Sequence, residues 1–370
     1  MSDQSSKKLS RITIRGFKSI KNCDLELGDI NVLIGSNGAG KSNFISVFEL
    51  LQNILKERLS VYAGKKGVSS LFYDGIKSTD SIEMEFFFGQ NSYSFTLILT
   101  ESNSLIFKDE HFNWYNEKEG RWYPRKIASG HSESKWKQGP EKSTFNEYIQ
   151  PILESQQWRV YHFHDTGPKA KMKQEHNISN SKNFDQEAGN LAAFLYRLKE
   201  HYYDDYKYIL KVVQMIAPYF RDFELEPQEG NKESIILRWQ QKDCDDVFNA
   251  SQLSDGTLRF ICLATLLLQP AKLQPATIII DEPELGLHPF ALTIFAEMVK
   301  KASVNSQIIL STQSAELLNY FDVEDIIVVD RGENGSEFKR LEMKQFKELE
   351  CSRFCLVLSL SSQLINTSIS

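Results

Sequence analysis

The hydrophobic and polar positions change period several times along the chain, and each change marks a strand or a helix. Residues 81–115 alternate apolar and polar side chains in two runs around Gly89-Gln90-Asn91, which predicts an antiparallel meander. Apolar side chains recur at helical spacing in 191–198 and 209–216, which predicts a helical lobe. Further helices are predicted for 258–268 and 289–302, and strands for 30–34, 159–163, 278–280, 308–310 and 326–329.

Other segments show neither the alternation typical of a strand nor the spacing typical of a helix. Residues 116–147 and 167–183 are polar and are predicted as loops. The tail 351–370 is rich in Ser and Leu with one charge, Arg353, and three readings stay open: a partner-binding strand, a disordered end or an altered terminus. No segment sustains the heptads of a long coiled coil. Strands that alternate with helices predict an α/β protein.

A glycine-rich loop joins the strand 30–34 to a helical pattern. Its sequence, Gly35-Ser36-Asn37-Gly38-Ala39-Gly40-Lys41-Ser42, fits the GxxxxGK[ST] pattern of phosphate-binding loops. Backbone N–H groups and the helix dipole at such a loop favour a phosphate. We predict that Lys41 contacts the β- and γ-phosphates of a nucleotide and that Ser42 binds Mg²⁺.

Two acids follow the apolar run 278–280. Ligands of open α/β sheets bind at the carboxyl ends of the strands, where Asp281 and Glu282 lie. Asp281 is predicted to bind Mg²⁺ through water, and Glu282 to orient or deprotonate an attacking water. The alternative is that this acidic pair only ends a strand.

A third segment, Leu253-Ser254-Asp255-Gly256-Thr257, opens the apolar helix 258–268. Backbone N–H groups there and the hydroxyl of Ser254 would point at an anion. An ordinary helix N-cap is the other reading. The segment precedes Asp281 at the distance typical of ABC-type signatures.

Together these motifs resemble the RecF, SMC and OLD branch of the ABC ATPases, and most closely its small bacterial AAA, OLD-like ATPase family. The resemblance implies an ABC-ATPase head: a P-loop NTPase with a mixed central sheet, an antiparallel side sheet and a helical lobe. The matching segments are 12–20, 35–42, 253–257, 281–289 and 311–314.

The resemblance also implies roles for individual residues. Two heads would dimerise on ATP, with Ser254, Asp255 and Gly256 of one head acting in trans on the glycine loop of the other. Leu287 and His288 would form the D-loop. The implied catalytic residues are Lys41, Glu282 and Gln313, and the metal ligands are Ser42 and Asp281. The implied ATP-binding residues are Lys18, Ser19, Asn37, Gly38, Ala39, Gly40, Lys41, Ser42 and Asn43.

The chain departs from the family pattern at two places. Gln313 stands where many relatives carry His, and a glutamine can donate a hydrogen bond but cannot become a cation, so slow hydrolysis is expected. No Q-loop glutamine follows the antiparallel strands, and His164 and Asp165 are predicted to replace it. A metal site made of His162, His164 and Asp165 is the alternative.

Composition narrows the classes of protein that fit. A net charge of -6 argues against nucleic-acid binding over the whole surface. Five cysteines without zinc spacing indicate a reduced, cytoplasmic protein. No apolar run approaches the roughly 20 residues of a membrane span. The insert 116–142 mixes basic and aromatic side chains, so that a solvated loop and a DNA contact both stay open.

The predicted organisation has four segments. They are 1–166, the first part of the ATPase lobe with the P-loop, side sheet and polar insert 116–147; 167–256, the helical lobe with the signature; 257–350, the second part of the ATPase lobe; and 351–370, the tail.

The predicted function is an ATP- and Mg²⁺-dependent ATPase that forms a homodimer or higher homo-oligomer and regulates a separate nuclease or toxin in bacterial anti-phage defence. Only 57 residues follow Gln313, too few for the Toprim nuclease domain of OLD proteins, so no intrinsic nuclease is expected. A RecF-like DNA-repair clamp and a nucleotide-gated scaffold with little turnover are the alternatives. A transporter ATPase fits less well, because the insert and the signature are unlike it.

Overall fold

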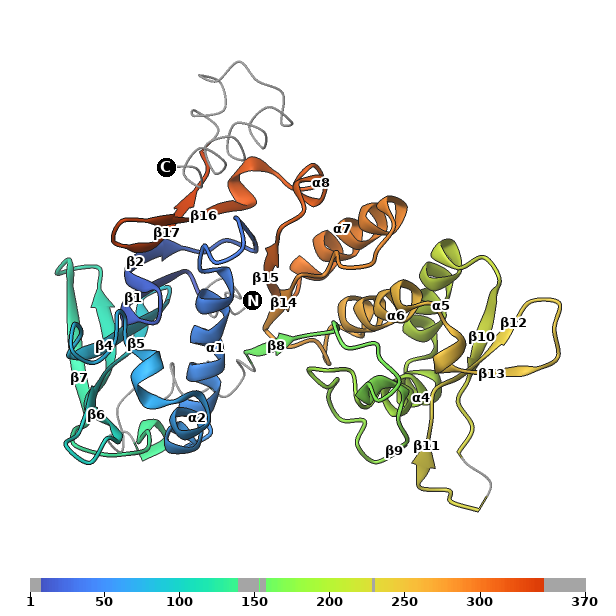
Figure 1. Ribbon diagram of the computed structural model, residues 1–370, viewed down its shortest axis with the longest axis horizontal. Helices are drawn as coiled ribbons and strands as arrows, with labels where there is room; N and C mark the ends of the chain where they lie inside the picture. The colour runs from blue at the N-terminus through green and yellow to red at the C-terminus, as the bar shows by residue number, and fades with distance from the viewer. Residues whose placement is uncertain (1–7, 139–152, 154–157, 228–229, 343–370) are drawn as a thin grey trace. The chain divides into compact units, whose positions relative to one another are not determined.

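The computed structural model describes residues 8–138, 153, 158–227 and 230–342 (Figure 1). The predictions for the tail 351–370 and for the end of the polar insert lie outside these residues. The chain divides into two compact units. Unit 1 comprises 1–159, 275–279 and 322–370, and unit 2 comprises 160–274 and 280–321. These two units are defined by compactness, whereas the four segments predicted from the sequence are defined by their motifs. The units therefore do not test the four segments, which stay a prediction.

Unit 1 contains a mixed sheet whose described strands follow the order β7-β6-β5-β4-β1-β2-β17-β16-β3. β16 and β3 are parallel, and the other neighbours in this series are antiparallel. The predicted meander 81–115 is confirmed as β4, β5 and β6. The bounds are β1 Arg11–Phe17, β2 Ile20–Glu26, β3 Ile30–Ile34, β4 Ser81–Phe88, β5 Asn91–Leu99, β6 Leu105–Asn116, β7 Arg121–Ala128, β16 Ile326–Gly332 and β17 Gly335–Arg340.

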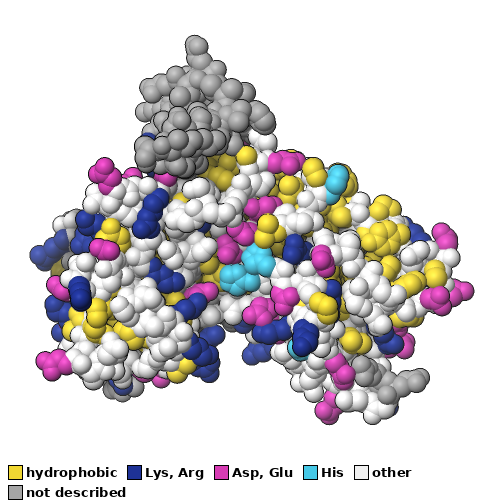
Figure 2. Space-filling model, viewed as in Figure 1, with side chains coloured by type: hydrophobic (Ala, Val, Ile, Leu, Met, Phe, Trp, Pro, Cys, Tyr) yellow, Lys and Arg dark blue, Asp and Glu magenta, His cyan; other side chains and the backbone are white. Residues whose placement is uncertain are grey.

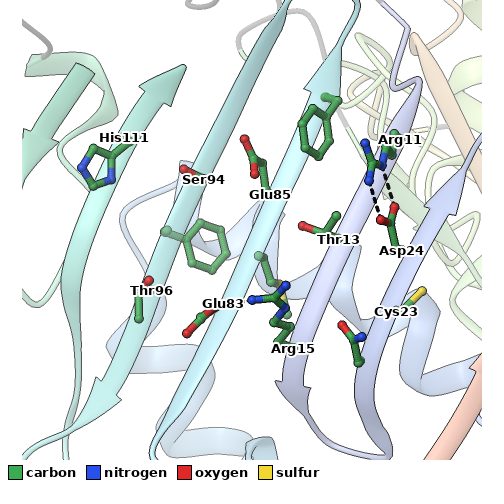
Figure 3. A pocket seen from close by; sticks show the side chains of 14 residues that line it. Arg11, Thr13, Arg15, Cys23, Asp24, Glu83, Glu85, Ser94, Thr96 and His111 are labelled. Carbon is green, nitrogen blue, oxygen red and sulfur yellow. Dashed lines mark hydrogen bonds and ion pairs between the residues drawn. The ribbon is translucent and has the colours of Figure 1, made fainter. Parts of the chain in front are cut away.

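Two helices lie on one side of this sheet, α1 (Lys41–Leu55) and α2 (Leu59–Lys66) (Figure 1). The alternation in β1 explains the arrangement, because Ile12 and Ile14 are fully buried whereas Arg11 and Arg15 lie on the other face. That other face is a polar hollow (Figure 3). Its charges pair with one another, as in the contact of 2.6 Å between Arg11 Nε and Asp24 Oδ1.

The prediction of a loop for the whole of 116–147 is wrong for part of that segment. Arg121–Ala128 form β7, which pairs antiparallel with β6 as the outer strand of the sheet. Most side chains of β7 are exposed. An outer strand with few buried residues on either face needs no apolar alternation, and for this reason the periodicity gave no strand signal.

The residues that follow β7 are anchored to the sheet by Glu110, a fully buried carboxylate in β6. His131 Nε2 lies 3.0 Å from Glu110 Oε2, the backbone N–H of Lys135 donates to the same oxygen at 2.9 Å, and Ser134 donates to Oε1. Tyr93 also donates to Glu110 at 2.6 Å. The pKa of the Tyr93 phenol is raised, mainly by burial and also by the negative charge of Glu110. The insert is therefore partly built into the sheet.

The same anchoring uses residues that suggested a DNA contact. Trp136 is buried, and its indole N–H donates to the Leu55 carbonyl at 3.0 Å. Lys126 pairs with Asp109 at 2.7 Å, and Lys137 with Glu57 at 3.0 Å. Lys142 lies outside the described residues. These side chains already have structural partners, and the DNA contact stays a prediction.

Three further strands, β15, β14 and β8, are neighbours in that order. Their bounds are β15 Gln307–Thr312, β14 Thr277–Asp281 and β8 Arg159–Tyr161. The strands predicted at 278–280 and 308–310 are confirmed. β8 ends two residues before the predicted end at 163, because the next residues bond outside the strand: the His162 N–H donates to the Gln186 carbonyl at 2.9 Å.

Unit 2 holds the predicted helical lobe. Within it α6 packs against α5 and α7, and α4 packs against α5. The four helices predicted in this region are confirmed. The bounds are α4 Leu191–His201, α5 Tyr203–Ile216, α6 Asp255–Leu268, α7 Pro289–Ser303 and α8 Ala315–Leu318. Two small sheets complete the unit, β10-β12-β13 and β11-β9: β9 His176–Asn177, β10 Phe220–Glu224, β11 Ser234–Ile235, β12 Arg238–Gln241 and β13 Val247–Asn249.

Two findings concern the predictions from composition. Among the described residues, no helix has the length and apolar character that crossing a bilayer requires. Cys23, Cys244 and Cys262 are free thiols, and burial raises the pKa of Cys23 to about 12.

Candidate nucleotide-binding site

The glycine loop joins β3 to the N-terminus of α1 in unit 1. Lys41 is buried, with 5% of the residue exposed. Its ammonium donates to the carbonyls of Gly35 at 2.6 Å and Ser36 at 3.0 Å. Ser42, Asn37 and Gly38 are exposed on the loop and the first turn of the helix. Backbone N–H groups at this helix end, together with the Lys41 cation, would favour an anion.

Two of the loop glycines allow close approach of neighbouring groups. A Cβ on Gly35 would lie 2.1 Å from the Val329 carbonyl oxygen in β16. Gly40 has a φ of 122°, and its Cβ would lie 2.1 Å from Ser336 Oγ in β17. The spacing of glycines in the motif therefore reflects packing on β16 and β17 as well as space for a phosphate.

A small hydrogen-bonded cluster lies behind Gly40. Asn43 Nδ2 and Ser336 Oγ each donate to Ser19 Oγ at 2.7 Å, and the Ser336 N–H donates to the Ser19 carbonyl at 2.7 Å. Ser19 and Asn43 were predicted to contact ATP, and the structure brings them together beside the loop. Ser336 was missed, because only the turn at 333–335 marked this part of the sequence.

Lys18, also predicted to contact ATP, has a left-handed backbone with φ of 49°. Its ammonium donates to Ser46 Oγ at 2.8 Å and lies 5.4 Å from the centre of the Phe17 ring. Burial lowers the pKa of Lys18. The side chain is thus held against α1, one turn beyond Ser42.

The two predicted acids lie at the end of β14 in unit 2. Glu282 has a left-handed backbone with φ of 45°, an uncommon conformation for a residue with a side chain. Its N–H donates to the Ser311 carbonyl at 2.8 Å, and its carboxylate accepts a hydrogen bond from Gln313 Nε2. The structure therefore brings together Glu282 and Gln313, which are far apart in the sequence.

Glu284 supports this pair and was missed as a site residue. Its Oε1 accepts hydrogen bonds from Thr312 Oγ1 at 2.7 Å and from the Gln313 N–H at 2.9 Å. The end of β15 is thereby fixed against the loop that follows β14. Glu284 therefore fixes the position of the Gln313 backbone.

Ser254 caps α6, as the simpler of the two sequence readings states. Its Oγ accepts the Thr257 N–H at 3.2 Å, and its side chain is exposed. Asp255 Oδ1 lies 3.7 Å from the ammonium of Lys173. A Ser254 hydroxyl that caps the helix still lies at the helix N-terminus. The role as an N-cap and the predicted role as an anion-binding signature residue are therefore compatible.

Gly256 allows the signature helix to approach the predicted D-loop. A Cβ at this position would lie 2.4 Å from the Gly286 carbonyl oxygen. Arg259, one turn further along α6, donates to the carbonyls of Phe163 at 3.0 Å, His164 at 2.7 Å and Leu285 at 2.7 Å. Arg259 was missed, and it ties the signature helix to both neighbouring segments.

Replacing Gly256 by alanine should destabilise the fold. The helix propensity of alanine favours the change by up to about 1 kcal/mol. The clash is with a backbone atom that cannot rotate away, and overpacking of this kind costs about 1–3 kcal/mol. We expect a lower urea midpoint for Gly256→Ala. The matched control is Gly64→Ala in α2, where a Cβ would have no neighbour within 4 Å and stability should hold or rise. An unchanged midpoint for Gly256→Ala would contradict the clash.

The remaining predicted residues take distinct places. Leu287 is partly exposed, and His288 caps α7 by accepting the Phe290 N–H at its Nδ1 at 3.3 Å. Asp165 accepts the Gly167 N–H at 3.0 Å in a local turn. His162 Nδ1 instead lies 4.0 Å from Asp281 Oδ2. The side chain near the imidazoles is therefore Asp281.

The predicted site residues are divided between the two units. Unit 1 offers the phosphate loop with Lys41 and Ser42. Unit 2 offers Asp281, Glu282 and Gln313. Within unit 2, Asp281 fits the role of a Mg²⁺ ligand, since its Oδ1 is a buried carboxylate oxygen with no hydrogen-bond partner within the described part of the chain. Such an oxygen is stabilised by a cation or a metal-bound water.

This fold and these groups define a P-loop ATPase of the ABC type with an SMC-like head. The protein family described as "AAA domain, putative AbiEii toxin, Type IV TA system" matches residues 30–319. The chain belongs to this family.

Three relatives illustrate the similarity. The "Old nuclease" of Escherichia phage P2 is 23% identical over 381 aligned positions, which cover 92% of this chain and 62% of that protein. The crystal structure of the SmcHead bound to the C-winged helix domain of ScpA has a TM-score of 0.55 at 15% identity and covers 92% of this chain and 99% of that one. The Smc head domain with an extended coiled coil, bound to the C-terminal domain of ScpA derived from Pyrococcus furiosus, has a TM-score of 0.54 at 14% identity, with 92% and 98% covered.

These structures confirm the predicted α/β head fold. The longest described helices, α1 and α7, have 15 residues each, so the described residues contain no long coiled coil. The chain spans about three fifths of the curated relative that it matches.

Proposed function

We propose that this ATPase hydrolyses ATP with Mg²⁺ between two paired heads and thereby controls a separate effector, a nuclease or a toxin, in anti-phage defence. The observation that carries the hydrolytic part is the contact between Glu282 and Gln313 at the ends of β14 and β15. In this proposal Glu282 is the general base and Gln313 is its hydrogen-bond donor, and the contact between them supports these roles. Family membership supports the use of a nucleotide.

The proposed chemistry follows from the side chains. The loop N–H groups and Lys41 bind the phosphates, and Ser42 and Asp281 would hold Mg²⁺, which when bound neutralises charge on the β- and γ-oxygens. Glu282 accepts the proton of the attacking water, and Gln313 fixes the orientation of that carboxylate. Gln313 adds no positive charge to the transition state, so turnover should be slow.

Pairing of two heads is supported by the surface around the signature in unit 2. Ser254 is exposed, and so are two apolar side chains near the predicted D-loop, Leu285 (40% exposed) and Phe290 (50%). Exposed apolar groups beside an anion-binding helix end suit a surface that is covered only when a second, nucleotide-loaded head arrives.

A mixing experiment tests whether the signature acts in trans. Lys41→Ala should remove ATP binding in its own loop, and Ser254→Arg should block pairing by placing a bulky cation where the hydroxyl meets the opposite nucleotide. In a mixed dimer one site carries both changes and the other carries neither. ATPase activity should therefore return on mixing two inactive variants.

The measurement is the steady-state ATPase rate across mixing ratios, with two affinity tags to prove that mixed dimers form. Each variant mixed with itself is the control. If mixed dimers form and stay inactive at every ratio, the trans arrangement is wrong.

The proposal of a nuclease or toxin effector is supported by the family, whose description includes "putative AbiEii toxin, Type IV TA system", and by the similarity to the Old nuclease of Escherichia phage P2. One observation favours a second candidate, a nucleotide-gated scaffold: Gln313 instead of His at the γ-phosphate sensor predicts little turnover. Single-turnover and steady-state rates separate the two, because a scaffold would bind ATP and pair without completing repeated cycles. A cytoplasmic location stays a prediction.

A further inference from the structure

Two histidines that follow β8 form a cluster with the acid that ends β14. His162, His164 and Asp281 each offer a ligand atom, and these atoms lie within 4.8 Å of one another. All three residues are partly buried. Histidine side chains gather beside acidic ones on the face shown in Figure 2. Mg²⁺ binding by Asp281 would not require either imidazole, because Mg²⁺ selects oxygen ligands.

The backbone holds the two imidazoles in place. His162 and His164 are two residues apart on an extended segment, a spacing that directs side chains to the same side. The His162 N–H donates to the Gln186 carbonyl at 2.9 Å, and the His164 carbonyl accepts from Arg259 at 2.7 Å. β8 is also the neighbour of β14 in the sheet. The cluster is therefore organised by contacts that span the sequence.

The carboxylate of Asp281 has an oxygen that could bind a metal ion. Asp281 Oδ2 lies 4.0 Å from His162 Nδ1, and Asp281 Oδ1 is buried with no hydrogen-bond partner among the residues described. Leaving a buried carboxylate oxygen without a donor is unfavourable, and a bound cation would offset this. Two imidazoles and one carboxylate form a ligand set that suits first-row transition ions.

We propose that His162, His164 and Asp281 form a binding site for a divalent transition-metal ion of the Zn²⁺ class. Tetrahedral zinc with ligands at about 2.0–2.2 Å places the ligand atoms about 3.3–3.6 Å apart, so side-chain rotations that move these atoms by about 1–1.5 Å close the cluster. Three protein ligands leave the fourth position to water. The site lies beside the proposed ATP chemistry and shares Asp281 with it, but it needs no nucleotide to form.

The test titrates the nucleotide-free, full-length protein with Co²⁺, whose visible absorption reports the coordination geometry, and then displaces the ion with Zn²⁺. The wild type should bind one equivalent. His162→Ala and His164→Ala should each weaken binding at least about tenfold, since even partners behind the ligands contribute that much in metal sites. The control is His201→Ala, an exposed histidine at the end of α4, which should bind like the wild type.

Three results would overturn the site. One is equal Co²⁺ affinity of the wild type and of the double variant His162→Ala His164→Ala, with both shown by circular dichroism to be folded. Another is a strong near-ultraviolet thiolate band, which would place the ion on cysteines. The third is the absence of Co²⁺ binding by the wild type. Because ATP and Mg²⁺ are left out, none of these outcomes depends on the proposed ATPase function.

Discussion

Replacing Lys41 by alanine is expected to weaken ATP binding by at least about a hundredfold and to abolish ATP turnover. The ammonium is held at the loop by the carbonyls of Gly35 and Ser36, from where it can turn to the phosphates. Hydrogen bonds to charged groups contribute about 1.5–3 kcal/mol each, and two such bonds account for a hundredfold or more. Equilibrium binding of a fluorescent ATP analogue measures the effect.

Lys41 is nearly buried, so its truncation also changes packing. Lys41→Met keeps an unbranched stem and removes only the ammonium, and it should bind ATP as weakly as Lys41→Ala. The matched control is Lys65→Ala, which removes an exposed cation from α2. ATP affinity close to that of the wild type in a folded Lys41→Met protein would contradict the assigned role.

Replacing Glu282 by glutamine is expected to slow hydrolysis by about 10²–10⁴-fold while ATP stays bound. Glutamine keeps the size of the side chain and can still accept a hydrogen bond from Gln313, but it cannot take the proton of the attacking water. A nucleotide that binds and is not cleaved should hold two heads together. Single-turnover hydrolysis and gel filtration with ATP measure the two effects.

The control for Glu282→Gln is Glu297→Gln, an exposed carboxylate that pairs with Lys300 on α7 at 3.1 Å. It should change neither rate nor association. Hydrolysis by Glu282→Gln at the wild-type rate would show that another group accepts the proton. Slow hydrolysis without ATP-dependent association would leave the general base standing and contradict the paired heads.

The local patterns of the sequence determined the core of the fold and of the candidate site. β3, the glycine loop and α1 follow one another without interruption, so their period and their motif appear in a single stretch. The same holds for β14 with Asp281, and for Ser254 at the start of α6. Periodicity and helix capping depend on neighbours within a few residues, and these features were predictable for that reason.

The parts that were missed depend on residues far apart in the chain. Ser336 meets Ser19 across 317 positions, and Arg259 reaches the Phe163 carbonyl across 96. β7 carried no periodic signal, because its hydrogen bonds to β6 form it while its side chains stay largely exposed. None of these contacts leaves a repeating pattern in the amino-acid sequence.

The imidazoles of His162 and His164 show most clearly which features follow from the sequence and which depend on the tertiary structure. The sequence by itself determined that both lie on one extended segment, and it suggested Asp165 as the third ligand because that residue is adjacent. The tertiary structure turns Asp165 into a local turn with Gly167 and brings Asp281 to the imidazoles. The extended geometry of the segment follows from the alternation of its side chains. The identity of the acid beside the imidazoles depends on which strands become neighbours in the sheet, and long-range hydrogen bonds and packing decide the order of the strands.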